Sequence, residues 1–202
     1  KAIMLGIENG YAIGKDLSRV AHFRKRGVVY MTLCHNGNND ICGSARYNEE
    51  NLGVTPFGEQ VIQEMNRLGM MVDLSHSGER TFYETLDISS QPVVCSHSSS
   101  RALCDHPRNL TDDQLRAIAR KGGVVQVCLY SGFLRKERPA HILDAIEHLN
   151  HMVNVMGIEH VGIGSDFDGD GGIIGCNDSS EMINLTRQLL HERYSEEDIR
   201  RI

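Results

Sequence analysis

Two apolar runs that each lead into Ser-His-Ser constrain the fold of this 202-residue chain more than any other feature. The first run, residues 70–74, leads to His76, and the second, residues 93–95, leads to His97. The segment between them has the apolar spacing of a helix, so the whole is predicted to be a βαβ unit of a parallel sheet. Parallel neighbours lie about 4.8 Å apart and end at the same edge, so both imidazoles are expected side by side there.

Two histidines in this arrangement can reach one metal ion, because Zn–N bonds are about 2.0–2.1 Å long. A single histidine at a strand end is more often a hydrogen-bonded loop residue than a ligand. The repeated local context places a metal site beside that simpler interpretation as an equal alternative, because matches to short patterns include false positives.

The rest of the chain continues the alternation of apolar runs and amphipathic segments. The predicted strands are residues 2–7, 28–33, 70–74, 93–95, 124–129 and 161–164. The clearest helices are residues 16–26, 112–121, 142–156 and 180–192, with a Thr-Pro helix start at residues 55–56 and a further start near Ser195. This order predicts an α/β fold, and no G-x-G-x-x-G motif follows a strand to indicate a Rossmann domain.

A (β/α)8 TIM barrel fits the order best. A complete barrel needs ~250 residues, so six of the eight β/α units are expected here and two are expected to be missing at the N-terminus. Residues 1–202 are therefore predicted to form one partial barrel domain. The start at Lys1 rather than at a methionine also suggests part of a longer chain.

Composition excludes several classes of function. The chain is 40% hydrophobic and 24% charged, as expected for a globular protein, and no apolar run approaches the ~20 residues of a membrane helix. A net charge of −6 without a long Lys/Arg cluster disfavours nucleic acid. Six scattered cysteines without C-x-x-C favour a reducing, cytoplasmic location, with export left open because an upstream signal would not be seen. A homo-oligomer is expected.

The residues that follow the predicted strands are mostly potential ligands or acid–base groups. In chain order they are Glu8, His35, His76, His97, Tyr130 and Asp166. In a barrel, such strand ends converge on one mouth. Imidazole and carboxylate together suit Zn²⁺, and a bridging carboxylate can hold two ions about 3.5–4 Å apart.

Other polar residues receive less specific interpretations. Asp166 lies nearer its strand than Asp168, which has the ordinary role of a turn carboxylate. Asp73 lies inside its strand and is expected to be a core or supporting group. The remaining histidines lie in predicted helices or loops, where solvated or capping roles are expected: His22, His106, His141, His148, His151, His160 and His191.

Six short motifs carry a resemblance to a known family. They are GIENG, LCHN, DLSHSG, CSHSSS, the RN of HPRN and GIGSDFDG, in this order along the chain, with TPFG and NRLG between them. Together they resemble the membrane (renal) dipeptidases, the M19 metallopeptidases of the amidohydrolase-like barrels. The resemblance implies a zinc-dependent hydrolase that cleaves the peptide bond of dipeptides through a hydroxide bridging two zinc ions.

The resemblance also implies roles for individual residues. Glu8 matches the carboxylate that bridges two Zn²⁺ ions, and His76 and His97 match the histidines on one of these ions. Asp166 matches the aspartate that binds the other ion and handles the proton of the bridging water.

The remaining matches concern the substrate. His35 matches the histidine that contacts the substrate and the developing oxyanion, and Arg108 matches the arginine that holds the terminal carboxylate. Tyr130 falls at a strand end that lines the substrate pocket.

One departure matters. The family has a His-x-Asp pair at the end of its first strand, and no such pair precedes Glu8 here. The second zinc site is therefore two ligands short, and these residues alone can fail to bind that ion or to be active.

Two alternatives remain open. The same metal chemistry could serve a lactonase, a deaminase or a phosphoester hydrolase, since a fold does not fix a substrate. A barrel could also be kept as a non-catalytic binding scaffold.

Overall fold

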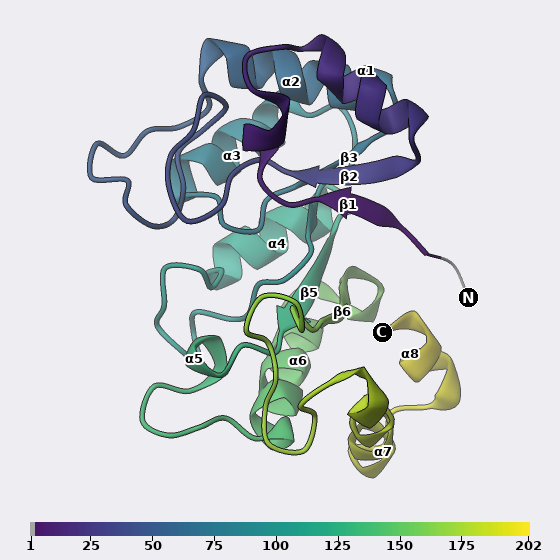
Figure 1. The fold of residues 1–202 in the computed structure, drawn as a ribbon. Coiled ribbons are helices and arrows are strands. Elements are labelled where there is room, and N and C mark those ends of the chain that lie inside the picture. Colours follow the sequence, from purple (N-terminus) through teal and green to yellow (C-terminus); the bar gives the residue numbers. More distant parts are fainter. Residues whose placement is uncertain (1–2) are drawn as a thin grey trace. The chain divides into compact units, whose positions relative to one another are not determined.

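The computed structural model describes residues 3–202 (Figure 1). The chain divides into two compact units, residues 1–94 and 95–202. Helices and strands alternate in both, which confirms the α/β class and the β/α order of an incomplete barrel. That one domain spans residues 1–202 stays a prediction. No described helix has the length and apolar character needed to cross a bilayer.

The first unit is built on parallel strands that pair in sequence order, β1 to β2, β2 to β3 and β3 to β4. The predicted first strand is shorter than expected, and its first residue, Ala2, lies outside the described residues. The elements are β1 (Leu5–Ile7), α1 (Ser18–Lys25), β2 (Val28–Thr32), α2 (Pro56–Arg67), β3 (Met71–Asp73), α3 (Glu79–Ile88) and β4 (Val94–Cys95), with a 3-10 turn at Gly10–Ile13.

Helix α2 illustrates how the sequence specifies this unit. The Thr55 hydroxyl accepts a hydrogen bond from Gly58 N at 3.0 Å, and Pro56 occupies the first helical position, as predicted. Val61, Ile62 and Met65 are fully buried on the face that packs on β3, each contributing roughly 1.5–3 kcal/mol. Figure 1 shows α1 and α2 together over β1–β3.

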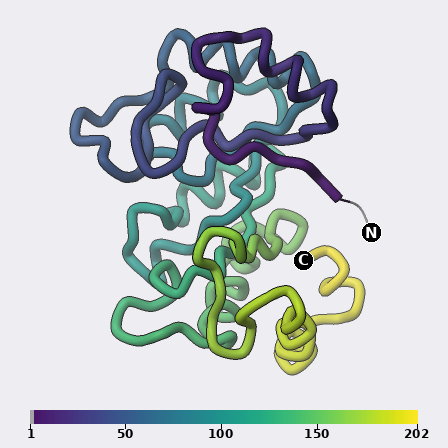
Figure 2. The backbone as a smooth tube through the Cα atoms, in the orientation of Figure 1, coloured from purple at the N-terminus to yellow at the C-terminus, as the bar shows by residue number. Residues whose placement is uncertain are grey.

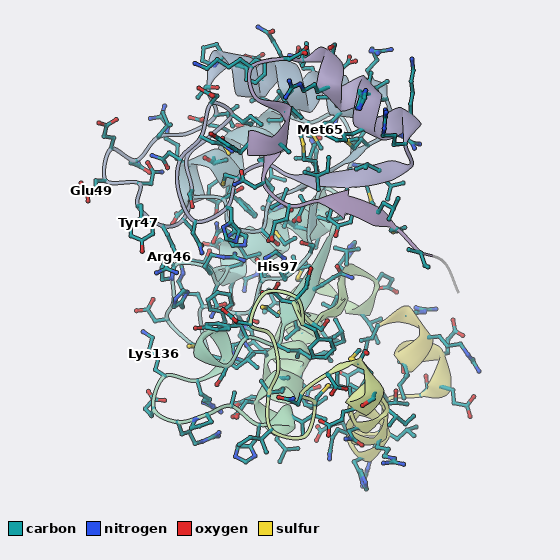
Figure 3. The ribbon with its side chains drawn as sticks, in the orientation of Figure 1. Arg46, Tyr47, Glu49, Met65, His97 and Lys136 are labelled. Carbon is teal, nitrogen blue, oxygen red and sulfur yellow. The ribbon has the colours of Figure 1, made fainter. Side chains whose placement is uncertain are left out.

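A long loop joins β2 to α2 and doubles back on itself (Figure 2). Asn39 fixes the start of this loop, because the Asn39 Oδ1 accepts from Ile41 N and Cys42 N while the Asn39 Nδ2 donates to Leu33 O. Gly43 permits the close crossing, since a Cβ there would lie 1.9 Å from Leu52 O. The side chains of Arg46, Tyr47 and Glu49 extend from this loop (Figure 3).

The second unit pairs β5 with β6 in parallel. The segment after β4 runs beside β5, where Ser98 N donates to Gln126 O at 2.8 Å. The elements are α4 (Asp112–Arg120), β5 (Val124–Cys128), α5 (Ser131–Leu134), α6 (Ile142–Met156), β6 (Val161–Gly164), α7 (Ile183–His191) and α8 (Glu196–Arg201), with 3-10 turns at Ile158–His160 and Ser179–Glu181.

Asp144 closes the start of α6. Although burial by itself would raise the pKa of this carboxyl, hydrogen bonds from Arg138, the His141 N–H and Arg135 hold it well below its usual range. His141 and Asp144 form a reciprocal cap of the helix, so the capping role expected for His141 is confirmed. The polar segment that precedes α6 is thereby tied to the helix.

His148 has a role that the sequence analysis missed. Its side chain is 1% exposed, its Nδ1 accepts from Ser100 N at 3.1 Å, and its Nε2 lies 3.3 Å from Leu134 O. The expectation of a solvated or capping histidine is therefore wrong here, because the residue lies on the buried face of α6. Burial lowers the pKa of His148 to about 4.

This shift predicts a pH-dependent stability. The folded pKa lies below the unfolded value near 6.5, so the stabilisation is present above pH 6.5 and is lost as pH falls toward 4. Between pH 7.5 and pH 5 the full-length protein should lose about 2 kcal/mol of unfolding free energy from this group. His148→Asn can keep an acceptor for Ser100 N and should flatten the dependence. Urea titrations at both pH values measure the free energy of unfolding, and His191→Asn is the control at an exposed position. If the free energy of unfolding depends on pH as strongly in His148→Asn as in the wild type, His148 is not the group responsible.

Candidate metal centre

Glu8 and His76 meet at the carboxyl ends of β1 and β3. His76 Nε2 lies 3.1 Å from Glu8 Oε1, the imidazole is buried, and the carboxylate is 44% exposed. The alternation of strands and helices brings these residues together, because β1, β2 and β3 are parallel and end at one edge. A carboxylate oxygen and an imidazole nitrogen in contact are two of the donors that Zn²⁺ prefers.

The backbone and neighbours of His76 fix its ring. Its φ angle is +71°, in the left-handed region that costs a non-glycine residue on the order of 1–3 kcal/mol. The carbonyl of His76 accepts from Ala45 N at 2.7 Å, and its Nδ1 lies 3.2 Å from Asn36 Oδ1. Contact at Nδ1 leaves Nε2 as the nitrogen directed at Glu8, the usual arrangement for a metal-binding histidine.

His35, at the end of β2, lies against His76. The two ring centroids are 4.2 Å apart with the planes tilted by 37°. The Ser44 hydroxyl lies 2.5 Å from His35 O and 3.3 Å from His76 O, so the long loop ties the two strand ends together. Three residues predicted from the strand ends, Glu8, His35 and His76, therefore form one cluster in the first unit.

Asp73 supports this cluster from inside the core. Its carboxylate is fully buried and accepts from the Thr32 hydroxyl at 2.6 Å and from Ser75 N at 3.0 Å. These bonds join β2 to β3 and shape the turn that leads to His76. The expectation of a core or supporting group is confirmed.

In the second unit, His97 and Arg108 lie together. Both are buried, and Arg108 Nη2 donates to His97 O at 3.2 Å. The Ser96 hydroxyl lies 2.9 Å from His97 Nδ1, so a nearby side chain contacts the same ring nitrogen that Asn36 contacts at His76. Figure 3 labels His97 among the side chains that follow β4.

An aromatic group formed by Phe133, His106 and Tyr130 contacts the Arg108 side chain through Phe133. The guanidinium carbon of Arg108 lies 5.2 Å from the centroid of the Phe133 ring, and that centroid lies 4.6 Å from the centroid of the His106 ring and 4.7 Å from that of Tyr130. Tyr130 is 36% exposed, so this predicted pocket residue lies at the open side of the group.

Asp166 follows β6 in a strained turn. Its φ angle is +59°, and its carbonyl accepts from Gly169 N at 2.9 Å and Gly171 N at 2.7 Å. The Cys128 thiol lies 3.8 Å from Asp166 Oδ2. Burial first, and the nearby carboxylate in addition, raise the pKa of Cys128 to about 12, so this thiol stays protonated and is no nucleophile.

The predicted site residues thus fall into two groups. Glu8, His35 and His76 belong to the first unit, and His97, Arg108, Tyr130 and Asp166 belong to the second. Sequence reasoning missed the residues that support them: Asn36, Ser44, Ser96 and Phe133. Adjacency to a histidine was an available signal for Asn36 and Ser96, whereas Ser44 and Phe133 are brought in only by tertiary folding.

Carboxylates and imidazoles at the ends of parallel strands are typical of metal-dependent hydrolases built on β/α barrels. The model of the membrane dipeptidase family, peptidase family M19, matches residues 1–202. The chain therefore belongs to this family of metallopeptidases.

Individual relatives agree. An uncharacterized dipeptidase of Schizosaccharomyces pombe is 44% identical over 173 residues, which are 83% of this chain and 42% of that protein. The crystal structure of the probable dipeptidase PvdM from Pseudomonas aeruginosa matches with a TM-score of 0.95 at 28% identity, over 100% of this chain and 66% of that one.

A metallopeptidase from Rhodobacter sphaeroides, liganded with a phosphinate mimic of the dipeptide L-Ala-D-Ala, matches with a TM-score of 0.92 at 29% identity. The match covers 98% of this chain and 59% of that one. The chain spans about two fifths of the length of the curated relatives it matches.

Proposed function

We propose that the full-length protein containing this chain is a zinc-dependent dipeptidase that hydrolyses the peptide bond of dipeptides. The observation that carries the proposal is the Glu8–His76 pair, a carboxylate oxygen 3.1 Å from an imidazole nitrogen at the ends of parallel strands. Membership of the membrane dipeptidase family supports the substrate class.

The proposed ligands are the four residues selected from the strand ends. Glu8, His76 and His97 would hold one Zn²⁺ ion, and Glu8 and Asp166 would contribute to a second. The donor set fits zinc, since imidazole nitrogens and carboxylate oxygens are its common protein ligands. A zinc pair supplies Lewis acidity and a nucleophilic water at neutral pH.

The remaining residues act on the substrate and its protons. Asp166 takes the proton of the attacking water and passes it to the leaving amine. The His35 imidazole donates to the developing oxyanion. Arg108 binds the C-terminal carboxylate through charge-assisted hydrogen bonds, which restricts the enzyme to short peptides, and Tyr130 lines the pocket. A homo-oligomer and a cytoplasmic location stay predictions.

Metal removal tests this function. Purified full-length protein should contain close to two zinc ions per chain, hydrolyse dipeptides, lose that activity on chelation and regain it with added Zn²⁺. A phosphinate dipeptide mimic should inhibit it, because such a ligand is bound by the Rhodobacter sphaeroides neighbour.

A substrate panel separates the alternatives. Dipeptides, lactones, phosphotriesters and deaminase substrates are assayed on the same zinc-loaded sample. Turnover of any of the others without dipeptides would assign a different metal hydrolase, and less than one metal per chain without chelator-sensitive hydrolysis would indicate a binding scaffold.

A further inference from the structure

Phe133, on the short helix α5, has contacts that its position in the sequence does not explain. Its ring is 9% exposed and contacts three side chains: Arg108, His106 and Tyr130. Its backbone carbonyl accepts from Asn109 Nδ2 at 2.8 Å, so α5 is also tied to the residue that follows Arg108. Helix α5 therefore contacts Arg108 through the Phe133 ring and Asn109 through the Phe133 carbonyl.

The contacts define the orientation of the Arg108 guanidinium. A guanidinium is planar and carries five N–H donors in a fixed fork. The Phe133 ring lies 5.2 Å from its central carbon, at a distance typical of cation–π contact, which limits tilting of the group. The hydrogen bond from Nη2 to His97 O limits rotation of the group as well. Together the two contacts select one direction for the fork.

Orientation matters because a carboxylate is bound best by two parallel N–H donors. An arginine that is already held in place loses less side-chain freedom when the ligand binds. His106 also contributes, since its Nδ1 accepts from Arg108 N at 3.1 Å and its ring lies against Phe133. The aromatic group therefore holds both the backbone and the side chain of Arg108.

We propose that Phe133 is a positioning residue that orients Arg108 toward the substrate carboxylate and so determines specificity for peptides with a free C-terminus. This inference rests on the proposed dipeptidase function and on the role of Arg108 in it. Tyr130, whose ring plane is inclined by 66° to that of Phe133, is 36% exposed and is the solvent-facing member of the same aromatic group.

The test compares an alanyl dipeptide with its C-terminal amide on zinc-loaded full-length enzyme. Phe133→Leu should raise KM for the free acid about 2- to 30-fold, the range of a cation–π contact, and leave kcat and the KM for the amide unchanged. The inhibition constant of a phosphinate dipeptide mimic should rise by a similar factor. Phe133→Tyr keeps the ring and should behave as the wild type.

Two controls separate positioning from packing. Phe82→Leu removes a fully buried phenylalanine from α3 and should lower stability without changing the ratio of the two KM values. Phe133→Leu added to Arg108→Ala should cause no further change for the free acid, because a residue that acts through Arg108 has no effect without it.

The possible outcomes distinguish failure of the role proposed for Phe133 from failure of the proposed dipeptidase function. Equal increases in both KM values, or additive effects in the double variant, overturn the role of Phe133. If the wild type does not favour the free acid, or Arg108→Ala affects both substrates equally, the proposed role of Arg108 fails first. If no dipeptide is hydrolysed, the proposed function itself fails.

Discussion

Replacing His76 with alanine is expected to lower the zinc affinity of the full-length protein by more than about 100-fold and to reduce dipeptide hydrolysis to near background. Even residues that only support a metal ligand typically contribute 10–100-fold to affinity, so loss of a ligand itself should cost more. Competition with a chromophoric chelator measures the affinity, and metal analysis after dialysis gives the ions retained per chain.

Backbone strain provides a second variant at the same position. Since His76 has a φ angle of +71°, alanine stays strained there, whereas glycine does not. His76→Gly should lose zinc as fully as His76→Ala but unfold at a higher denaturant concentration. His191→Ala, at an exposed position in α7, is the control and should retain both metal and activity. Retention of two zinc ions by either His76 variant contradicts the ligand assignment.

Replacing Arg108 with alanine should raise KM for dipeptides with a free carboxylate by about 10- to 100-fold, the usual value of hydrogen bonds to a charged group. The KM for the corresponding amides should change little, because an amide carries no charge for the guanidinium to bind. Steady-state kinetics on matched acid and amide substrates measure the difference.

Arg108 also has a structural contact, and the experiment must separate the two roles. Its Nη2 donates to His97 O, so truncation can disturb a proposed zinc ligand. Loss of that bond would lower zinc content and affect both substrates alike. Arg108→Lys keeps the charge without the planar fork and should give an intermediate KM for the acid. Equal increases in KM for the acid and the amide at full zinc occupancy contradict the proposed binding of the substrate carboxylate by Arg108.

The features that could be predicted from sequence are local or periodic. The predicted helix start at Thr55 is confirmed, and the Thr111–Gln114 capping box and the end of α6 at Gly157 depend on hydrogen bonds of equally short range. The position of Glu8 and His76 at one edge of the sheet follows from the parallel order of β1, β2 and β3, and the two side chains meet across the end of β2.

The features that escaped prediction depend on partners far away in the sequence. His148 is buried because α6 turns that face inward, and its partner Ser100 lies 48 residues away. Phe133 contacts Arg108 because of where α5 lies, and no periodic pattern in the sequence predicts that placement. The left-handed backbone at His76 likewise accompanies a hydrogen bond from the distant Ala45 N to His76 O.

That backbone geometry has a consequence for the evolution of the protein. Selection for thermal tolerance alone would favour glycine at residues 76 and 166, since glycine adopts these angles without penalty. Each such replacement would remove a proposed ligand. Heat-adapted descendants with these glycines would thus be more stable and catalytically inactive. Natural sequences that keep His76 and Asp166 despite the backbone strain would indicate continued selection for activity.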